Sequence, residues 1–391
     1  MMQFRDLGAQ YGRLKAEIDR RMAEVIRGSQ YILGPEVKEL EDKLAAFAGV
    51  KHCVACANGT DALQLIMMAW GIGPGDAVFT SDFTFFASAG AVSILGAEPV
   101  LVDIDERTFN ISPDALEEAI EAVLREGRLT PRAVIPVDLF GLPADYPRIE
   151  EIARRYGLKV LEDGAQGYGG SIHGKRACAF GDAATTSFFP AKPLGCYGDG
   201  GAMFTDDDDM DSLLRSLRAQ GRSPSDKYDN RLIGMNSRLD TLQAAILLPK
   251  LDAFISYELD AADAVARRYT QALEGAAVTP LVPQGYFSAW AQYTILLPDE
   301  AARDGLRKHL AGKGIPSMVY YPRGLHQQTA YAGMRLADSR FPVTSAATRR
   351  VLSLPMHPYL KPEDADAVCE AVLGFISQQK PGKVDKDAVS C

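Results

Sequence analysis

The sequence predicts an α/β protein whose larger part has three layers around a mostly parallel sheet and is followed by a smaller α+β part. Two observations predict this fold. Short apolar runs alternate with helical segments from about residue 50 to residue 205, which is typical of βαβ units. Near Asp240 the pattern changes to a long helical stretch and then to mixed strands and helices. A chain of 391 residues has room for both parts, at roughly 100–200 residues per domain.

The first part is expected to open with two amphipathic helices. Leu14, Ile18, Met22 and Val25 recur at helical spacing, and a second apolar stripe follows Pro35, a residue that suits the first turn of a helix. A short strand is expected in the run VKHCVACANG. The further runs that we predict as strands are Ala77–Thr80, Val100–Ile104, Ala133–Leu139, Lys159–Leu161 and Ala202–Thr205.

The second part is expected to begin with a helical stretch from Asp240 to Leu273, which Pro249 should kink or break. A strand, a helix, a second strand and a last helix then follow at Gln292–Leu297, Glu300–Gly312, Ser317–Tyr321 and Pro362–Ser377. These elements divide the chain into a large domain over residues 1–260, a small domain over 261–378 and a tail over 379–391. The tail is polar and lacks periodicity, so we expect it to be disordered.

Composition and charge argue against several classes of protein. The formal net charge of −9 is not that of a protein that binds nucleic acid or a membrane surface. The sequence has no apolar run of about 18 residues and no signal-peptide pattern, so we expect a cytoplasmic protein that does not enter the membrane. Six cysteines in a chain of this length do not form a disulfide framework.

Cys53 and Cys56 have the C-x-x-C spacing of some metal and redox sites. A structural zinc site needs a second pair of ligands at suitable spacing, and the other cysteines are isolated from one another. The histidines show no H-E-x-x-H spacing. We therefore interpret the pair as packing thiols of a short strand and predict no metal site.

The segment from Lys159 to Thr205 holds the residues best suited to chemistry. Asp163 comes with Glu162 at the carboxyl end of a predicted strand, where open α/β sheets bind their ligands. Lys192 lies in SFFPAKPLG, and desolvation in such apolar surroundings makes an amine a usable nucleophile. Alone, the aspartate is typical of a turn and the lysine of a snorkelling side chain. Together they are the two groups that pyridoxal 5'-phosphate (PLP) requires, a lysine for its aldehyde and a carboxylate for its pyridine nitrogen.

A phosphate site would complete such a pocket. The residues Asn58, Gly59, Thr60 and Asp61 come directly before an apolar helix, and the N-terminus of a helix presents free N–H groups to an anion. Alone, this segment is typical of an ordinary N-cap. Ser187, five residues before Lys192, offers a hydroxyl to the same phosphate.

Several blocks of the sequence resemble the DegT/DnrJ/EryC1/StrS nucleotide-sugar aminotransferases, in that family's order and spacing. They are QYILGPEVKELE, CANGTDALQL, LEDGAQ, TSFFPAKPLGCYGDGGA, NSRLDTLQAAILLPKL and YYPRGLHQQ. The resemblance covers about residues 3–378. It implies the PLP-dependent transferase fold type I (aspartate aminotransferase-like), with a three-layer large domain and a smaller C-terminal α+β domain.

The resemblance also assigns roles to matching positions. Lys192 matches the lysine that holds the cofactor and moves a proton between cofactor and substrate. Asp163 matches the partner of the pyridine nitrogen, and Gln166 matches a residue on the 3-hydroxyl side of the ring. Further cofactor contacts are implied for the phosphate segment Gly59, Thr60 and Asp61, for Ser187, for Phe85 as a stacking aromatic and for Asn236 from the partner subunit. A contact from a partner subunit implies a homodimer with a shared site.

Within the family, the blocks look closest to enzymes that aminate carbon 3 of a UDP-linked 2-acetamido-3-keto-hexuronate for bacterial O-antigen, with L-glutamate as the amino donor. Tyr31, Arg238 and Tyr321 would then contact the sugar nucleotide, Arg238 being suited to an anionic group. Five positions depart from these relatives. Ser29, Ala191 and Tyr320 stand where the relatives have glycine, serine and histidine, respectively. Gly164 and Gly167 stand where the relatives have the first alanine and the serine of an EDAAQS block. The departures lie on the sugar side. A related 3-keto or 4-keto-6-deoxy sugar linked to UDP, dTDP or GDP therefore stays open.

Three other functions are weighed against this one. A nicotinamide-dependent oxidoreductase needs G-x-G-x-x-G directly after a first strand, and the glycines between Gly164 and Gly170 have a different spacing and position. Sugar dehydratases of the same fold have histidine at the position of Lys192. A non-catalytic regulator that keeps the fold is an alternative against which the set of Asp163, Gln166, Ser187 and Lys192 argues.

Overall fold

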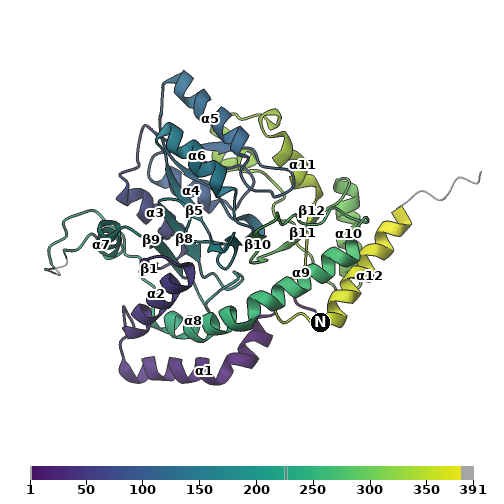
Figure 1. The fold of residues 1–391 in the computed structure, drawn as a ribbon, viewed down its shortest axis with the longest axis horizontal. Coiled ribbons are helices and arrows are strands. Elements are labelled where there is room, and N and C mark those ends of the chain that lie inside the picture. Colours follow the sequence, from purple (N-terminus) through teal and green to yellow (C-terminus); the bar gives the residue numbers. More distant parts are fainter. Residues whose placement is uncertain (1, 224, 227, 380–391) are drawn as a thin grey trace, which may run out of the picture.

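The computed structural model describes residues 2–223, 225–226 and 228–379, and its centre is a seven-stranded sheet (Figure 1). In spatial order the strands are β1 (His52–Cys56), β9 (Gly201–Thr205), β8 (Ala183–Ser187), β5 (Lys159–Asp163), β4 (Thr130–Ile135), β2 (Asp76–Ser81) and β3 (Glu98–Val102). β9 runs antiparallel to its neighbours β1 and β8, whereas the other four pairings are parallel. The prediction of a mostly parallel sheet is confirmed.

Helices cover both faces of this sheet, so the large unit has three layers. Successive side chains of a strand point to opposite faces, and in β1 Val54 and Ala55 accordingly belong to two different hydrophobic clusters. The helices of one face are α3 (Gly59–Ala69), α4 (Ala87–Ile94) and α7 (Asp208–Leu217). Those of the other face are α2 (Pro35–Ala48), α5 (Pro113–Glu126), α6 (Tyr146–Tyr156) and α8 (Thr241–Ala253), and α1 (Leu7–Gly28) packs along α8.

A second hydrophobic core surrounds a small antiparallel sheet of β11 (Tyr293–Leu296) and β12 (Val351–Leu354). The helices of this unit are α9 (Leu259–Leu273), α10 (Glu300–Gly312), α11 (Pro342–Arg350) and α12 (Pro362–Gln379), and Figure 1 shows α9 and α12 side by side. A third, three-stranded sheet is formed by β10 (Tyr286–Phe287), β6 (Ser171–Ile172) and β7 (Lys175–Arg176). The boundary that we predict between residues 260 and 261 falls at the start of α9. Beyond Gln379, the tail predicted to be disordered lies outside the described residues.

The structure contradicts one prediction of local structure and part of a second. The run Ser317–Tyr321 is not a strand, since it makes only a single bridge from Met318 to Ser353, and β12 pairs with β11 instead. The four residues of β12 are all buried, so the core selects this later apolar run. Pro249 does not break its helix, because α8 continues through it with most of its residues buried, and packing outweighs the local preference. The helical pattern changes further on, in a π-helical turn at Phe254–Glu258.

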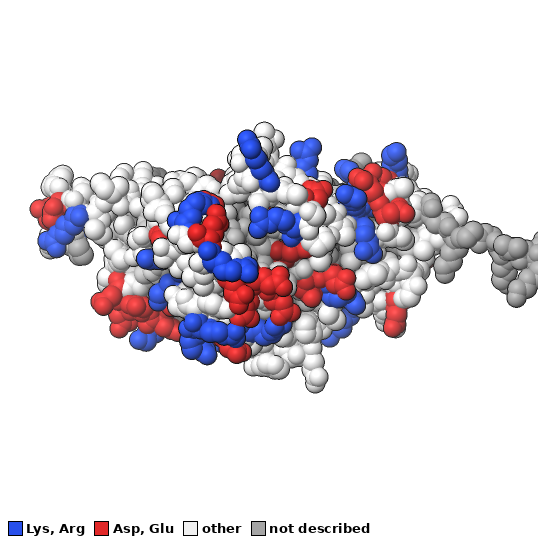
Figure 2. All heavy atoms as spheres, turned by 90° about the horizontal axis from the view of Figure 1, so that it is seen from above, with Lys and Arg blue, Asp and Glu red and all other residues white. Residues whose placement is uncertain are grey.

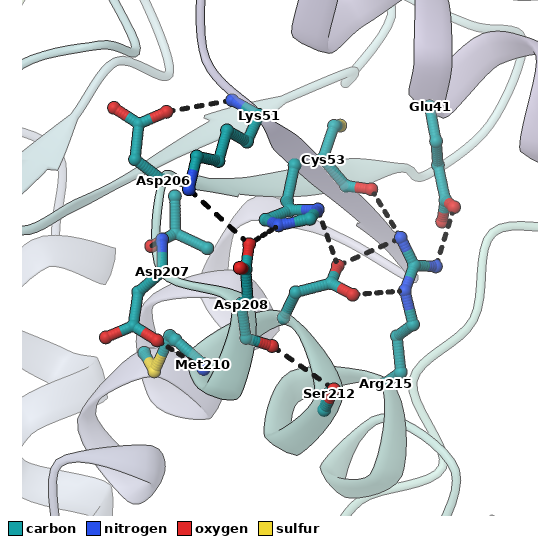
Figure 3. Close-up of polar contacts among 12 residues, drawn as sticks. Glu41, Lys51, Cys53, Asp206, Asp207, Asp208, Met210, Ser212 and Arg215 are labelled. Carbon is teal, nitrogen blue, oxygen red and sulfur yellow. Dashed lines mark hydrogen bonds and ion pairs between the residues drawn. The ribbon is translucent and has the colours of Figure 1, made fainter.

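A buried ionic network ties α2 and α7 to strand β1 (Figure 3). Glu41 of α2 is 3% exposed and accepts hydrogen bonds from the backbone N–H of Ala55 at 2.9 Å and from Nη1 of Arg218 at 2.6 Å. Arg215 of α7 donates to the same carboxylate at 2.8 Å and to the carbonyl of Cys53 at 3.2 Å. Because Glu41 is paired with both arginines, its buried charge is compensated inside the fold.

Acidic and basic side chains alternate on the face of the molecule that carries α5 and α6. Figure 2 shows Lys and Arg side chains lying beside Asp and Glu side chains across this face. The ion pairs there include Arg148 with Asp114 at 2.6 Å and Arg128 with Glu98 at 2.6 Å. Opposite charges therefore offset one another locally on this face.

Candidate active site

Asp163 and Lys192 lie at the same edge of the main sheet. Asp163 is the last residue of β5, and Lys192 lies in the loop that follows β8, the parallel neighbour of β5. Parallel strands end at one edge, where α/β proteins bind their ligands. Burial lowers the pKa of Lys192, the charge of Asp163 opposes this shift and the charge of Arg5 adds to it. The structure therefore brings together the two groups that PLP requires.

The carboxyl group of Asp163 is enclosed, with 5% of the residue exposed. Its Oδ2 accepts a hydrogen bond from the hydroxyl of Ser88 at 2.8 Å, and its Oδ1 accepts one from the N–H of Ala165 at 3.2 Å. Burial raises the pKa of Asp163, whereas the Ser88 hydroxyl and the charge of Lys192 lower it. A pyridinium nitrogen at this place would add the cationic partner that a buried carboxylate needs.

Gln166 links the cofactor side of the site to a predicted substrate residue. Its Oε1 accepts a hydrogen bond from the N–H of Phe140 at 2.8 Å, and its Nε2 donates to the hydroxyl of Tyr321 at 3.2 Å. Tyr321 in turn packs edge to face with Tyr320 at 5.7 Å, and Tyr320 does the same with Phe4 at 6.2 Å. Gln166, Tyr320 and Tyr321 thus form one continuous wall.

The predicted phosphate segment forms a cradle at the start of α3. Asn58 caps the helix by accepting from the N–H of Asp61 at 2.8 Å, which leaves the N–H groups of Gly59 and Thr60 at the open helix end. A Cβ atom on Gly59 would lie 2.9 Å from Cβ of Ser187, so this glycine lets the helix end approach the hydroxyl of Ser187. A Cβ atom on Gly201 would lie 2.5 Å from the carbonyl carbon of Asn58. Two amides and one hydroxyl converge where a side chain would otherwise fill the space.

These residues fit PLP. A helix end with free amides suits its phosphate, a buried carboxylate suits its pyridine nitrogen, and a lysine in apolar surroundings suits its aldehyde. Phe85, the predicted stacking aromatic, lies in the loop between β2 and α4 and is 57% exposed, so its ring is open to a ligand. Its neighbour Phe86 instead stacks on Tyr331 at 5.4 Å.

The remaining predicted residues lie in a second group. Asn236 and Arg238 line an open cavity of about 470 Å³ together with Ile32, Ala57, Gly198, Asp199, Asp240 and Gln243. The carbonyl of Tyr31 accepts from the N–H of Thr241 at 2.9 Å, which holds Tyr31 beside the Arg238 segment. Neither Lys192 nor Asp163 lines this cavity. One chain therefore gathers its predicted substrate residues at two places, Tyr320 and Tyr321 near Gln166 and Tyr31 with Arg238 here.

Ser29 ends α1 in the left-handed conformation, with a φ of 54°. Glycine adopts this conformation most readily, so the glycine that we expect in relatives suits the backbone of this position. The hydroxyl of Ser29 donates a hydrogen bond to the carbonyl of Ile26, in the same helix, at 3.4 Å.

Several residues near the site were not found from the sequence. Ser88 contacts Asp163, Gly201 makes room for Asn58, and Arg5 donates to the carbonyl of Pro193 at 3.0 Å. Each acts across a long separation in the chain, so no local pattern marks it. Of these residues, Gly201 alone lies in a recognisable sequence pattern, the glycine-rich run GDGGA.

Among the described residues, no three His, Cys, Asp or Glu side chains are grouped so that they could hold a metal ion. Cys53 and Cys56 are buried free thiols on opposite faces of β1, where they belong to different hydrophobic clusters. No helix within the described ranges is both long and apolar enough to cross a membrane.

The sequence pattern of the DegT/DnrJ/EryC1/StrS aminotransferase family matches residues 13–373. A relative from Pseudomonas aeruginosa strain PAO1, UDP-2-acetamido-2-deoxy-3-oxo-D-glucuronate aminotransferase, is 47% identical over 95% of this chain and 99% of its own length. A second relative, UDP-N-acetyl-3-dehydro-alpha-D-glucosamine 3-aminotransferase of Acidithiobacillus ferrooxidans, is 40% identical over 94% of this chain and 96% of its own.

Solved structures agree with this assignment. A DegT/DnrJ/EryC1/StrS aminotransferase from Brucella abortus is 51% identical and superposes with a TM-score of 0.93 over 96% of this chain and 99% of its own. NtdA from Bacillus subtilis, solved with bound cofactor PMP, the amine form of PLP, is 30% identical with a TM-score of 0.84 over 93% of this chain and 82% of its own. With the paired Asp163 and Lys192 at the sheet edge, these findings establish that the chain belongs to the DegT/DnrJ/EryC1/StrS family of PLP-dependent aminotransferases.

Proposed function

We propose that this chain aminates carbon 3 of a UDP-linked 2-acetamido-3-keto-hexose or hexuronate, with L-glutamate as the amino donor. The names of the two relatives support this choice, because both describe a UDP sugar whose carbon 3 is oxidised. The product would be an amino sugar for bacterial surface polysaccharide. The observation that carries the reaction class is the pairing of the half-buried Lys192 with the buried Asp163 at one sheet edge.

The roles of the residues follow from their surroundings. PLP, when bound, supplies the electron sink for the carbon that exchanges its proton. Lys192 would hold the cofactor and then move that proton at its Nζ, a role that its lowered pKa favours. Asp163, fixed by Ser88, would keep the pyridine nitrogen protonated, and Gln166 would hold the 3-hydroxyl side. Gly59, Thr60 and Ser187 would bind the phosphate, with Asp61 in the same helix turn.

Arg238 and Tyr31 would recognise the nucleotide sugar. The guanidinium of Arg238 lines an open cavity, and a diphosphate or a uronate carboxylate is the kind of planar or oxygen-rich anion that arginine binds in bidentate fashion. Tyr31 is 45% exposed beside it, which leaves its ring free to contact a base or sugar. Tyr320 and Tyr321 would contact the sugar near the reacting carbon, since they adjoin Gln166.

A homodimer with a shared site is the second part of the proposal. In one chain, Arg238 and Asn236 line a cavity that does not include Lys192, so a partner subunit would be needed to bring them to a cofactor. Three large apolar side chains are exposed in the single chain: Phe85 at 57% in the loop before α4, Phe189 at 53% in the Lys192 loop, and Ile233 at 90% three residues before Asn236. Exposed apolar groups of this size are typical of a surface that another chain covers.

We also propose a cytoplasmic location. The five cysteines within the described residues are free and buried, which suits a compartment that keeps thiols reduced. The proposed substrates, a nucleotide sugar and L-glutamate, would be taken from the same compartment.

The experiment that tests the proposal is a substrate panel. Purified protein with PLP and L-glutamate is offered keto-sugars linked to UDP, dTDP or GDP, with the carbonyl at carbon 3 or carbon 4, and the aminated product and 2-oxoglutarate are measured. We expect the UDP-linked 3-keto-sugar to react fastest. A preference for a 4-keto-6-deoxy sugar would refute the substrate assignment.

The panel is repeated with Lys192→Ala and with Lys313→Ala, a control at an exposed lysine. Lys192→Ala should lose the visible absorbance of the bound cofactor and the activity, whereas Lys313→Ala should keep both. Wild-type protein that binds PLP but aminates no sugar would favour a regulatory function.

A further inference from the structure

The loop that carries Lys192 is folded tightly on itself. The N–H of Lys192 donates to the carbonyl of Phe189 at 2.8 Å, and the N–H of Cys196 donates to the carbonyl of Phe188 at 2.8 Å. A Cβ atom on Gly195 would lie 2.6 Å from the carbonyl oxygens of Phe189 and Pro190. The loop therefore has little internal freedom, and its orientation depends on its contacts with other segments of the chain.

Two cationic side chains hold it from outside, through carbonyl groups that follow Lys192. Nη2 of Arg5 donates to the carbonyl of Pro193 at 3.0 Å, and Nζ of Lys250 donates to the carbonyl of Gly195. Lys250 comes from α8 and is 1% exposed, and its Nζ also lies 4.7 Å from the ring centre of Tyr197. Arg5 comes from the segment before α1, nearly 200 residues away in the sequence.

The N-terminal segment that carries Arg5 is itself anchored. The carbonyl of Phe4 accepts from the N–H of Met356 at 3.1 Å, and the carboxylate of Asp6 caps α1 at the N–H of Ala9 at 2.8 Å. The ring of Phe4 packs against Tyr320. Adjacent residues of this segment thus contact the lysine loop and the wall that contains Tyr320.

Among the described residues, no carboxylate forms an ion pair with Arg5. Glu258 is the carboxylate that acts on both Arg5 and Lys250, but its oxygens are engaged by Gln10 at 2.9 and 3.1 Å and by the hydroxyl of Tyr359 at 2.5 Å. Burial lowers the pKa of Arg5 to about 10 and that of Lys250 to about 8. Arg5 thus remains a cation beside the loop at neutral pH.

We propose that Arg5 is a positioning residue of the aminotransferase site, which fixes the Lys192 loop through the carbonyl of Pro193 and sets the charge around the Lys192 amine. The charged groups that act on Lys192 are Asp163 from β5 and Arg5 from the N-terminal segment, and they act in opposite directions. Removing Arg5 would take away the charge that works against Asp163, while burial would still lower the pKa of Lys192. The Lys192 nitrogen would therefore hold its proton to higher pH than in the wild type. The inference rests on the proposed role of Lys192 as the cofactor lysine.

The test is a pH titration of the visible absorbance of the PLP-loaded full chain. Arg5→Met removes the charge and the donor, Arg5→Gln keeps a donor without the charge, and Arg27→Met, at the end of α1, is the control. We expect the titration midpoint to rise by about one pH unit in Arg5→Met and in Arg5→Gln, and to stay unchanged in Arg27→Met. The KM for the sugar should change little while kcat at neutral pH falls.

Thermal unfolding of the same samples separates this role from a structural one. A lower melting temperature in Arg5→Met with an unchanged titration midpoint would overturn the inference, and if that variant does not fold, the midpoint of Arg5→Gln decides. The wild-type titration distinguishes the two proposals. If the visible absorbance of the wild type with PLP does not depend on Lys192, the proposed function fails. If the wild type titrates as expected and both Arg5 variants have the same midpoint as the wild type, only the role of Arg5 is refuted.

Discussion

The hydroxyl of Ser88 donates to Oδ2 of Asp163 at 2.8 Å, and so a residue at the start of α4 fixes the carboxylate at the end of β5. A hydrogen bond to a charged group contributes about 1.5–3 kcal/mol. Because the bond stabilises the ionised form, it supports the carboxylate that a protonated pyridine nitrogen would require.

Ser88→Ala should therefore weaken PLP binding. Without the hydroxyl, burial raises the pKa of Asp163 further, and we expect the Kd for PLP to rise about tenfold, which is about 1.4 kcal/mol. Fluorescence titration of the apoprotein with PLP measures the change. Ser93→Ala in the same helix is the matched control, since its hydroxyl contacts Tyr331 at 3.2 Å instead. Equal Kd values for the two variants would contradict the role of Ser88.

The parts of the fold and site that could be predicted from the sequence are those with local signals. The strand end at Asp163, the apolar loop around Lys192 and the helix start at Gly59 each lie within one continuous run. Alternating strands and helices then place such ends at one sheet edge, because parallel strands share their direction. Proximity of Asp163 and Lys192 thus follows from topology before any side chain is placed.

The parts that could not be predicted depend on contacts between distant segments. The partners Ser88 and Asp163 are 75 residues apart, and Arg5 and Pro193 are 188 apart. The error at Ser317–Tyr321 has the same cause, because this run meets the small sheet only through the bridge from Met318 to Ser353, whereas β12 pairs with β11 along its length. Local propensity does not hold that information.

Asp138 and Glu162 form a buried pair of carboxyl groups under the sheet edge. Both are fully buried and hydrogen bonded to each other. The two oxygens of Glu162 accept from the N–H groups of Cys178 and Phe180 at 2.5 and 2.8 Å, whereas Oδ2 of Asp138 receives no donor from the described residues. Burial raises the pKa of both carboxyl groups, so the pair holds a proton in the folded state. The position of Oδ2 of Asp138 also explains Gly167, because a Cβ atom there would lie 2.2 Å from this oxygen.

This pair should make stability depend on pH. Burial raises the pKa of Asp138 to about 7, against about 4 in an unfolded chain. Between these values the folded state keeps a proton that the unfolded state has released, so the free energy of unfolding falls as pH rises. Asp138→Asn removes this proton and donates an amide hydrogen instead, and the variant should gain stability relative to wild type from pH 5 to pH 8.

Urea unfolding at both pH values, with Asp260→Asn as an exposed control, measures the difference. A constant stability difference between Asp138→Asn and wild type at the two pH values would show that the pair holds no such proton.

Glu41 should be among the costliest carboxylates to remove. It compensates Arg215 and Arg218, and Arg218 is 6% exposed (Figure 3 shows the contact with Arg215). Glu41→Ala would leave the buried Arg218 without its carboxylate partner, whereas Arg215 would keep its ion pair with Asp211 at 3.0 Å. We expect the free energy of unfolding to fall by about 3–5 kcal/mol. Glu39→Ala on the same helix, which removes an ion pair with Arg21 from a side chain that is 40% exposed, should cost less than about 1 kcal/mol. Chemical denaturation compares the two, and similar losses would contradict this account.

Gly201 should control the shape of the phosphate cradle. A Cβ atom at this position would lie 2.5 Å from the carbonyl carbon and 2.8 Å from the N atom at the junction of Asn58 and Gly59, which are backbone atoms that cannot rotate away. Gly201→Ala must therefore displace the start of α3, and with it the amides of Gly59 and Thr60 that would bind the phosphate of PLP. We expect the affinity for PLP to fall about a hundredfold, or about 2.7 kcal/mol. The control is Gly12→Ala, where a Cβ atom meets nothing within 4 Å. Titration of each apoprotein with PLP and with inorganic phosphate measures the effect, and a Gly201→Ala variant that binds PLP as tightly as Gly12→Ala would place the phosphate elsewhere.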